Sequence, residues 1–425
     1  MSNNLPTDCS KLILPNLDLI ASETELVIRK SRKFTPDGFL QSLLSSVVTG
    51  LASLNQIAGN LKDRVDAAMA PQSMHERFTH KSTAFLLATH NALIEQRYAL
   101  SRPALENSKI KRLVVEDASG VSMPKSNAQT FPAHGNHHGP TAGVKINFAY
   151  DLLRGEAISH SLVQATTQDK VIGRELLIEV QKNDFVLRDM GYFILAEFTA
   201  IEELGAWWLT RLPLTTNVFL EDGDALEKHL SSSKGPTLEL GVTVGEEGKA
   251  ARLVAIRAST QITESRRRER RKKAKEQGKT ASQKALIRDG WHLMLTNLPE
   301  SEASVVQLAE IYRARWAVEI QFRGWKQSLS LEKALNRKSN KHHLEALVLA
   351  GMIAHQLGLK MAQLLIGKIG RAKLSDEKLY DLLATLLIKS PSFTLLSDFS
   401  PDHRHITRAK RRRKSPVETG LQSLT

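Results

Sequence analysis

Four residues in the C-terminal half of the chain combine the side chains and the spacing that phosphate chemistry needs. They are Tyr312, Arg315, Glu319 and Lys326. Because an α-helix advances by about 100° per residue, one helix would gather the four side chains within an arc of about 60°. Glu319 could then bind a metal ion while the phenol and the two cations hold phosphate oxygens. Arg315 and Glu319 would equally form an ordinary surface ion pair, so this spacing needs support from elsewhere in the chain.

Two aspartates upstream each end an apolar run that predicts a strand. Asp117 ends LVVED and Asp189 ends FVLRD. Each alone is typical of a turn or a helix cap. Two acids at the carboxyl ends of strands can converge, and with Glu319 they would form a set of oxygen ligands suited to Mg²⁺ or Mn²⁺. Two such ions, about 3.5 to 4 Å apart, can activate an attacking oxygen and stabilise the leaving one.

Other ionisable residues nearby are not expected to join this cluster. Glu116 would face away from Asp117 because neighbouring strand residues alternate in direction. Glu310 would lie about 160° around the helix from Tyr312, and Asp184 is a further acid that we leave out. A histidine cluster, His134, His137 and His138, could suggest a transition-metal site, but its Gly, Pro and Asn neighbours and the absence of a nearby thiol favour a loop that contacts a polyanion.

The apolar pattern predicts a mixed α/β fold in five segments. Residues 1–109 have helical spacing, whereas 110–213 hold short β-branched runs followed by alternating helix and strand. Residues 214–290 contain strand candidates and a basic run, and they interrupt this core. Residues 291–343 return to a strand and then the long helix with the four residues above. Residues 344–425 are predicted to form apolar helices and a basic tail.

Composition limits the class of protein. With 425 residues, the chain is long enough for two or three domains that each bury a core. Its single cysteine, Cys9, excludes an intramolecular disulfide and a cysteine-based zinc cluster. No apolar run approaches the length of a membrane span, and the N-terminus lacks a signal-peptide pattern. We therefore expect a cytoplasmic protein that does not associate with membranes.

The net charge of +14 is concentrated in two segments. Residues 266–284 carry ten Lys and Arg against two acids, and residues 402–414 carry seven against one, so the rest of the chain is balanced. Two basic arms on a neutral globule favour a polyanion such as nucleic acid over loops that only aid solubility. In the N-terminal helices, a DNA-reading pair and a plain helical bundle are equally compatible with the pattern. The cations available to such a pair are Lys62, Arg64, Arg77 and Lys81.

The residues above resemble a known family, the DDE transposases of bacterial insertion sequences. Tyr312, Arg315, Glu319 and Lys326 match the Tyr-(2)-Arg-(3)-Glu-(6)-Lys signature of its insertion-sequence-four group, and LVVEDAS and LRDMGYF look like its two aspartate motifs. The resemblance covers about residues 110–350 and implies a ribonuclease-H-like core with a β-rich insertion between the second aspartate and the glutamate. It also implies a synaptic homodimer on double-stranded DNA, which brings together the terminal inverted repeats and the target, in the bacterial cytoplasm at the nucleoid.

The resemblance further implies cut-and-paste chemistry at a pair of Mg²⁺ or Mn²⁺ ions. Water cleaves the transposon end to free a 3′-OH, which then attacks target DNA. Tyr312, Arg315 and Lys326 would hold phosphates near the cleaved end, and Arg211 resembles a basic position that approaches the same DNA. The alternatives are an element-encoded repressor that binds DNA without cleaving it, and a general metal-dependent nuclease.

The sequence departs from the family's pattern at one position. Relatives that form a DNA hairpin stack a flipped base on a tryptophan in the strand before the signature helix. Here His292 stands at the expected position and Trp291 comes one residue earlier. Because a shift of one residue reverses the strand face, Trp291 is a candidate for base stacking or for core packing, and hairpin formation stays open.

Overall fold

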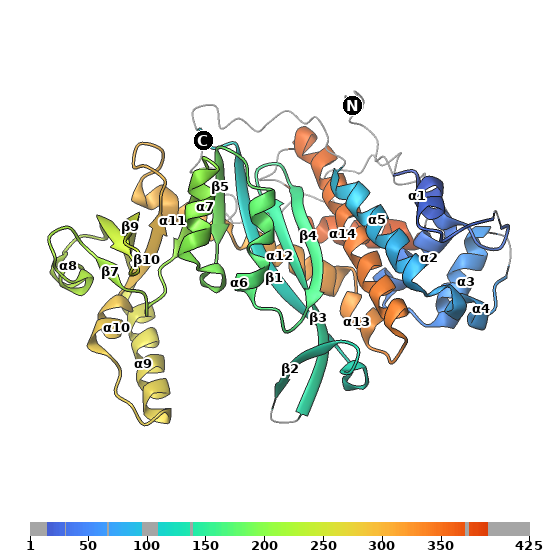
Figure 1. Cartoon of the computed structure of the whole chain (residues 1–425), viewed down its shortest axis with the longest axis horizontal. Coiled ribbons are helices and arrows are strands. Elements are labelled where there is room, and N and C mark those ends of the chain that lie inside the picture. Colours follow the sequence, from blue (N-terminus) through green and yellow to red (C-terminus); the bar gives the residue numbers. More distant parts are fainter. Residues whose placement is uncertain are drawn as a thin grey trace. The chain divides into compact units, whose positions relative to one another are not determined.

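The computed structural model describes residues 15–29, 31–65, 68–95, 109–136, 139–369 and 374–389 (Figure 1). They form two compact units, each assembled from separate stretches of chain. The helical unit takes the described residues of Met1–Pro103, Ala118–Thr167 and Ala317–Arg412. The sheet unit takes those of Ala104–Asp117 and Gln168–Trp316. The chain passes between the units within strand β1 (Arg112–Met123), after Thr167 and after Trp316. The last passage falls within residues 312–326, which contain the four signature residues and are called the signature segment below.

The helical unit is built around one long apolar helix. Its described helices outside the signature segment are α1 (Leu17–Glu23), α2 (Pro36–Thr49), α3 (Leu54–Val65), α4 (Pro71–Arg77), α5 (His80–Glu95), α13 (Leu331–Leu335), α14 (Lys341–Ile369) and α15 (Asp376–Lys389). Helix α14 packs against α2, α5 and α15. By length and composition α14 could cross a membrane, but 94% of its most apolar window is buried inside the protein, so it is a core helix. The helical character predicted for residues 1–109 and 344–425 is confirmed where the structure describes them.

Local signals explain where helix α2 begins and ends. Thr35 caps it by accepting a hydrogen bond from the Gly38 N–H, and Pro36 occupies the first turn, where a missing N–H costs nothing. Gly50 ends it with φ of 71°, a left-handed conformation that glycine adopts without strain.

Strands in the helical unit form an antiparallel group. β2 (Pro132–Asn136) pairs with β3 (Gly139–Asp151), and β3 pairs with β4 (Glu156–Gln164). Gly155, with φ of 68°, lies in the β3–β4 turn, where glycine adopts a left-handed conformation without strain. The second part of β1 neighbours β3, which gives the order β4–β3–β1 in this unit.

The sheet unit contains the parallel strands. The first part of β1 pairs in parallel with β5 (Asp184–Arg188), and β5 pairs in parallel with β6 (Trp207–Arg211). The orders β4–β3–β1 and β1–β5–β6, with β1, β5 and β6 parallel, are those of a ribonuclease-H-like core. The mixed α/β fold class is therefore confirmed. Helix α7 (Leu195–Glu203) connects β5 to β6 and stacks Phe198 on Trp208 at 4.4 Å between ring centroids.

An antiparallel extension continues this sheet beyond β6. Its strands are β10 (Trp291–Thr296), β9 (Lys249–Arg257), β8 (Thr237–Val244) and β7 (Val218–Phe219), in that order from β6. Three helices belong to the same region: α8 (Leu226–Ser232), α9 (Thr260–Glu276) and α10 (Gln283–Arg288) (Figure 1). The basic run lies in α9, which buries no side chain. Its contacts with the sheet are instead made by arginines, described below.

The prediction of one continuous helix that carries all four signature residues is wrong. Helix α11 (Val305–Ala314) ends before Arg315, α12 (Ala317–Arg323) begins after Trp316, and a π-helix, η4 (Gly324–Ser328), follows. At the break, the N–H groups of Arg315 and Trp316 donate to carbonyls three residues back, which tightens the turn. The four signature residues therefore lie on three short segments and a turn instead of on one stripe.

The stretch between β4 and β5 contains little regular helix. Its apolar spacing is that of an amphipathic helix, but it forms only the short α6 (Asp169–Ile172) and the 3₁₀ turn η2 (Glu175–Ile178). Gly173 lies between them, and a Cβ there would come within 2.9 Å of the Tyr192 ring.

Candidate active site

Asp117 and Asp189 lie just beyond the last paired residues of two parallel strands. The pairing of β1 with β5 runs through Val115 opposite Leu187, and each aspartate comes two residues later in the chain, Asp117 within β1 and Asp189 directly after β5. Asp189 immediately precedes the 3₁₀ turn η3 (Met190–Tyr192). Both side chains are half-buried. The paired strands thus carry two carboxylates at the same level of the sheet. The strand end predicted at Asp189 is confirmed, whereas the one predicted at Asp117 is wrong because β1 continues to Met123.

Arg315 contacts the first of these aspartates. Its Nη1 atom lies 3.3 Å from Asp117 Oδ2, and its side chain is only 8% exposed. The predicted surface ion pair would have left Arg315 in solvent. The helix break at this position instead directs the guanidinium toward Asp117.

Tyr312 contacts the second aspartate. Its hydroxyl donates to Asp189 Oδ1 and to the Arg188 carbonyl, both at 3.3 Å. Burial raises the pKa of Tyr312 above its ordinary value, so the phenol stays protonated and acts as a donor. The Arg315 guanidinium lies 5.9 Å from the Tyr312 ring. Within the sheet unit, these four predicted residues therefore form one site.

Glu319 and Lys326 belong to the helical unit. Glu319 lies half-buried in the first turn of α12. Lys326 lies in the π-helix, with Nζ 4.0 Å from a carboxylate oxygen of Glu332. Gly324 precedes Lys326 in this segment, and a Cβ on it would meet the Tyr380 ring at 2.5 Å. The part that Glu319 and Lys326 take in the site stays a prediction.

Arg211 and Trp291 line one cavity of about 250 Å³ in the sheet unit. Trp291 is 4% exposed, and the Arg257 guanidinium lies 4.2 Å from its ring centroid. Apolar walls come from Met190, Leu212, Leu214 and Leu293. The tryptophan thus packs in the protein and also borders a space, so base stacking and core packing both stay predictions.

Cations that sequence reasoning missed border the same cavity. They are Arg266, Arg270, Lys273 and Arg288. The first three lie on one side of α9 at spacings of four and three residues, a signal that the sequence contained but that was interpreted only as a basic arm. Arg270 makes a bidentate pair with Asp289 at 2.6 and 2.7 Å.

His292 is surrounded by arginines near this cavity. Arg266 Nη2 donates to its Nδ1 at 3.1 Å, and because a guanidinium only donates, the imidazole proton lies on Nε2. Burial, together with the positive charges of Arg266, Arg211 and Arg313, lowers the pKa of His292 to about 4. Within the described residues, Arg211 and Arg266 have no ion pair with a carboxylate. This part of the unit therefore offers uncompensated positive charge to an anion.

The donor atoms at the paired strand ends fit a divalent metal ion. Carboxylate oxygens are the ligands that Mg²⁺ and Mn²⁺ prefer. Asp117 and Asp189 are both within a unit whose strands fix them, and both are open enough to take an ion. Their polar contacts with Arg315 and Tyr312, at 3.3 Å, are longer than strong charged hydrogen bonds. These contacts can yield to a metal without breaking a closed ion pair.

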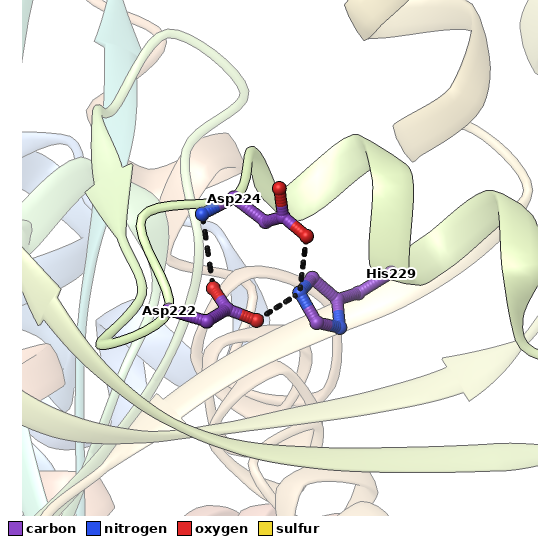
Figure 2. Close-up of side chains that lie close together, drawn as sticks. All are labelled: Asp222, Asp224 and His229. Atoms are coloured by element: carbon purple, nitrogen blue, oxygen red, sulfur yellow. Dashed lines mark hydrogen bonds and ion pairs between the residues drawn. The ribbon is translucent and has the colours of Figure 1, made fainter.

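A second cluster of possible metal ligands lies in the turn before α8 and in α8 itself (Figure 2). It consists of Asp222, Asp224 and His229. His229 Nε2 lies 2.9 Å from Asp222 Oδ2, and the Asp224 N–H donates to Asp222 Oδ1 at 2.9 Å. Lys228 Nζ lies 2.6 Å from Asp224. Because a lysine already compensates one of the two acids, we assign this group to the structure of the β7–α8 turn.

Several predicted DNA contacts in the N-terminal helices have partners inside the protein. Arg64 donates to Gln41, Ser45 and the Asn60 carbonyl. Lys81 pairs with Glu25 at 2.8 Å, and Arg77 lies over the Phe34 ring at 4.7 Å. The DNA-reading helix pair stays a prediction. Cys9, His137, His138 and the basic tail at 402–414 lie outside the described residues; His134 is exposed in β2.

Comparison with known proteins identifies relatives of this chain. The family model described as the transposase DDE domain matches residues 108–355. The chain is 26% identical to the transposase for insertion sequence element IS231F of Bacillus thuringiensis subsp. israelensis, over 85% of this chain and 81% of that protein. It is 24% identical to the IS231E transposase of Bacillus thuringiensis subsp. finitimus, over 92% and 86%. A cryo-EM structure of the piggyBac transposase synaptic complex with hairpin DNA matches with a TM-score of 0.48 and 10% identity, over 91% of this chain and 79% of that one.

The chain belongs to the transposase DDE domain family, because the family model covers more than half of its length. It is an insertion-sequence DNA transposase, an enzyme that cleaves DNA and transfers strands. Binding to DNA and a requirement for divalent metal ions are general properties of this family. The resemblance of the chain to insertion-sequence DDE transposases is thereby confirmed.

Proposed function

We propose that Asp117, Asp189 and Glu319 are the catalytic residues and together hold two Mg²⁺ ions, with Mn²⁺ as a substitute. The position of Asp117 and Asp189 at the same level, where the parallel pairing of β1 with β5 ends, is the observation that carries this proposal. When bound, the ions supply charge stabilisation and activate an attacking oxygen. Glu319 enters the proposal because it comes four residues after Arg315, in the first turn of α12, and this is the spacing of the family's signature.

The neighbouring side chains would position the DNA end. Arg315 neutralises Asp117 before DNA binds and can turn its remaining donors to a phosphate. Tyr312 stays a neutral donor beside Asp189 and fixes the orientation of that carboxylate. Lys326 would supply a further positive charge to the same strand. In this scheme, water is oriented for attack at the transposon end, and the freed 3′-OH then takes its place for attack on target DNA.

The cationic cavity would receive DNA near the cleaved end. Arg211 and Trp291 both border it, and the cavity of about 250 Å³ has an apolar wall and a basic rim. A nucleobase has one apolar face and follows a phosphate, which is the same combination. We therefore propose that Arg211 contacts the backbone and that Trp291 lies against a base displaced into this space. Fluorescence of 2-aminopurine at the terminal base pair tests this: it should rise on binding and stay low with Trp291→Ala.

The predicted organisation extends this proposal to the whole chain. Residues 1–109 would recognise terminal inverted repeats, 110–213 and 291–343 would form the catalytic core, 214–290 would be its insertion, and 344–425 would complete a helical C-terminal region. The enzyme would act as a homodimer that brings two ends together, in the bacterial cytoplasm at the nucleoid. The basic run of α9 supports a role of the insertion in binding DNA backbone.

One reconstitution tests the proposal. The purified protein is incubated with DNA that carries the inverted repeats flanking its gene, a target plasmid and Mg²⁺. We expect cleavage at the repeats followed by joined products, and neither with Asp117→Asn, Asp189→Asn or Glu319→Gln, which should still bind DNA. Cleavage without joining and without dependence on the repeats would instead identify a nuclease. Binding without cleavage by the unaltered chain would identify a repressor.

A further inference from the structure

Directly behind the two aspartates, Arg188 joins three segments of the sheet unit. Its Nε lies 2.9 Å from Glu116 Oε2 on β1, and its Nη1 donates to Glu197 Oε2 on α7 at 2.6 Å. Its Nη2 donates to the Gly173 carbonyl at 2.5 Å. The side chains of Arg188 and Glu116 are 0% exposed and that of Glu197 is 3% exposed. Arg188 is thus a fully buried cation that donates hydrogen bonds from Nη1 and Nη2, while its Nε lies at ion-pair distance from Glu116 without hydrogen-bond geometry.

The position of this network relates it to the active site. Glu116 and Arg188 each come immediately before an aspartate, in the same two strands and at the same level of the pairing. Because strand residues alternate, the Glu116–Arg188 pair lies on one face of the sheet and Asp117 and Asp189 lie on the other. The distance between β1 and β5 at this level therefore determines both the Glu116–Arg188 distance on one face and the separation of Asp117 and Asp189 on the other.

Regular pairing stops at this level, so backbone hydrogen bonds alone do not fix it. β5 ends at Arg188, and the chain turns into η3 directly after Asp189. Two carboxylates at the ends of adjacent strands also repel each other, which favours opening of the strand ends. Arg188 opposes this by linking β5 to β1 through Glu116, while Glu197 and Gly173 hold the guanidinium in place.

Close neighbours restrict the position of the Arg188 guanidinium. A Cβ on Gly173 would lie 3.2 Å from Glu197 Oε2 and 3.5 Å from Arg188 Nη2, so this residue must be small. The Tyr192 ring lies 5.8 Å from the guanidinium carbon. Lysine could carry the same charge here, but it could not reach three acceptors in three directions.

The other end of the same strand pair provides an internal reference. Arg112 on β1 makes a bidentate pair with Asp184 on β5, at 2.8 and 2.6 Å, and its Nη2 also donates to the Glu179 carbonyl at 2.7 Å. These side chains are 4% and 1% exposed. Both arginines therefore link β1 to β5 in the interior, but Arg112 does so at the start of the strands, away from the aspartates.

We propose that Arg188 is a positioning residue that sets the spacing of Asp117 and Asp189 for metal binding, through its buried contacts with Glu116, Glu197 and the Gly173 carbonyl. This inference rests on the proposed role of the two aspartates as metal ligands. Arg188 touches neither the metal nor DNA, and it acts only through the strand ends. Outer partners of metal ligands typically change metal affinity by about 10-fold to 100-fold when altered.

The test compares Arg188→Lys with Arg112→Lys in the full-length protein. Each change keeps the charge and removes the guanidinium fork, so both should lower the midpoint of thermal unfolding. Mn²⁺ binding to the protein on a pre-cleaved repeat duplex is then measured by electron paramagnetic resonance. We expect Arg188→Lys to weaken Mn²⁺ binding about 10-fold or more and to raise the Mn²⁺ concentration for half-maximal cleavage equally. Arg112→Lys should leave both values within about twofold.

Two further variants keep the outcome decisive. Glu116→Asp keeps the charge but shortens the reach to Arg188, so it should weaken Mn²⁺ binding even if Arg188→Lys does not fold; Asp184→Glu is its counterpart at the other strand end. Equal Mn²⁺ affinities for the variants at the two ends would overturn the positioning role. Asp117→Asn identifies a failure of the underlying proposal: if it leaves Mn²⁺ binding unchanged, the aspartates are not the ligands and both proposals fall.

Discussion

The two ends of the β1–β5 strand pair carry similar charged residues but use them differently. At the amino ends, Arg112 and Asp184 are buried and satisfy each other. At the carboxyl ends, Glu116 and Arg188 do the same on one sheet face, while Asp117 and Asp189 on the other face stay partly exposed. A closed ion pair specifies structure, whereas a carboxylate held at a strand end by long contacts is available to a metal and a substrate. Changes at the Arg112–Asp184 pair should therefore affect stability, and changes at Asp117 and Asp189 should affect catalysis.

The largest effect is expected from the exposed acids. Asp117→Asn or Asp189→Asn keeps the shape of the side chain and removes its charge, so cleavage of a repeat duplex should fall by about 10³-fold or more. The midpoint of thermal unfolding should stay unchanged or rise slightly in Asp189→Asn, because one repulsive charge is lost, and should fall slightly in Asp117→Asn, because the Arg315 guanidinium loses an ion-pair partner. A fall in stability with retained cleavage would reverse the comparison.

Removing one partner of the buried Arg112–Asp184 pair should lower stability and leave catalysis nearly unchanged. Arg112→Met leaves the buried Asp184 carboxylate without its partner, which should destabilise the protein by about 3 to 5 kcal/mol. Denaturant unfolding measures this loss. Cleavage per folded molecule should stay within about twofold of the unaltered protein at low temperature, and a double change of Arg112 to Met and Asp184 to Leu should recover most of the stability.

The stability of the protein should also depend on pH, because histidines such as His90 are buried in the helical unit. Burial lowers the pKa of His90 to about 4, whereas an unfolded histidine titrates near its ordinary value of 6.5. The unfolded state therefore binds more protons between these values, and the stability present above about pH 6.5 is lost as the pH falls toward 4. Between pH 6.5 and 5 this one group should cost about 2 kcal/mol in the free energy of unfolding. His90→Gln should flatten that part of the stability profile; an unchanged slope would show that His90 is not the cause.

Tyr312 should give the smallest effect, because its contact with Asp189 is single and long. Tyr312→Phe removes a donor 3.3 Å from Asp189 Oδ1 and leaves the ring in place. We expect cleavage to fall by about tenfold or less, with little change in stability. Single-turnover cleavage across a range of Mg²⁺ concentrations would show whether the loss lies in metal binding. A loss as large as that of Asp189→Asn would mean that the phenol takes part in the chemistry directly.

The sequence predicted those parts of the site that depend on local pattern. Asp117 and Asp189 could be found because each ends an apolar run, and parallel strands bring such ends together. The rejection of Glu116 followed from strand alternation, and its buried pair with Arg188 confirms it. These inferences need only the periodicity of a strand.

Features that depend on tertiary contacts could not be predicted in this way. The residues around Arg315 have good helical propensity, so nothing local indicates the break that directs the guanidinium to Asp117. The cations of α9 looked like a solvated arm because their partners are backbone carbonyls and Asp289, which no periodicity shows.

Anomalous diffraction from a crystal of the protein with a cleaved repeat duplex and Mn²⁺ tests the central claim most directly. We predict strong manganese peaks within coordination distance of the Asp117 and Asp189 carboxylates, with Glu319 completing the set and a DNA phosphate beside it. These peaks should vanish in Asp117→Asn crystals grown in the same way. Manganese bound elsewhere, or the same peaks in the variant, would contradict the assignment of these residues as the catalytic metal ligands.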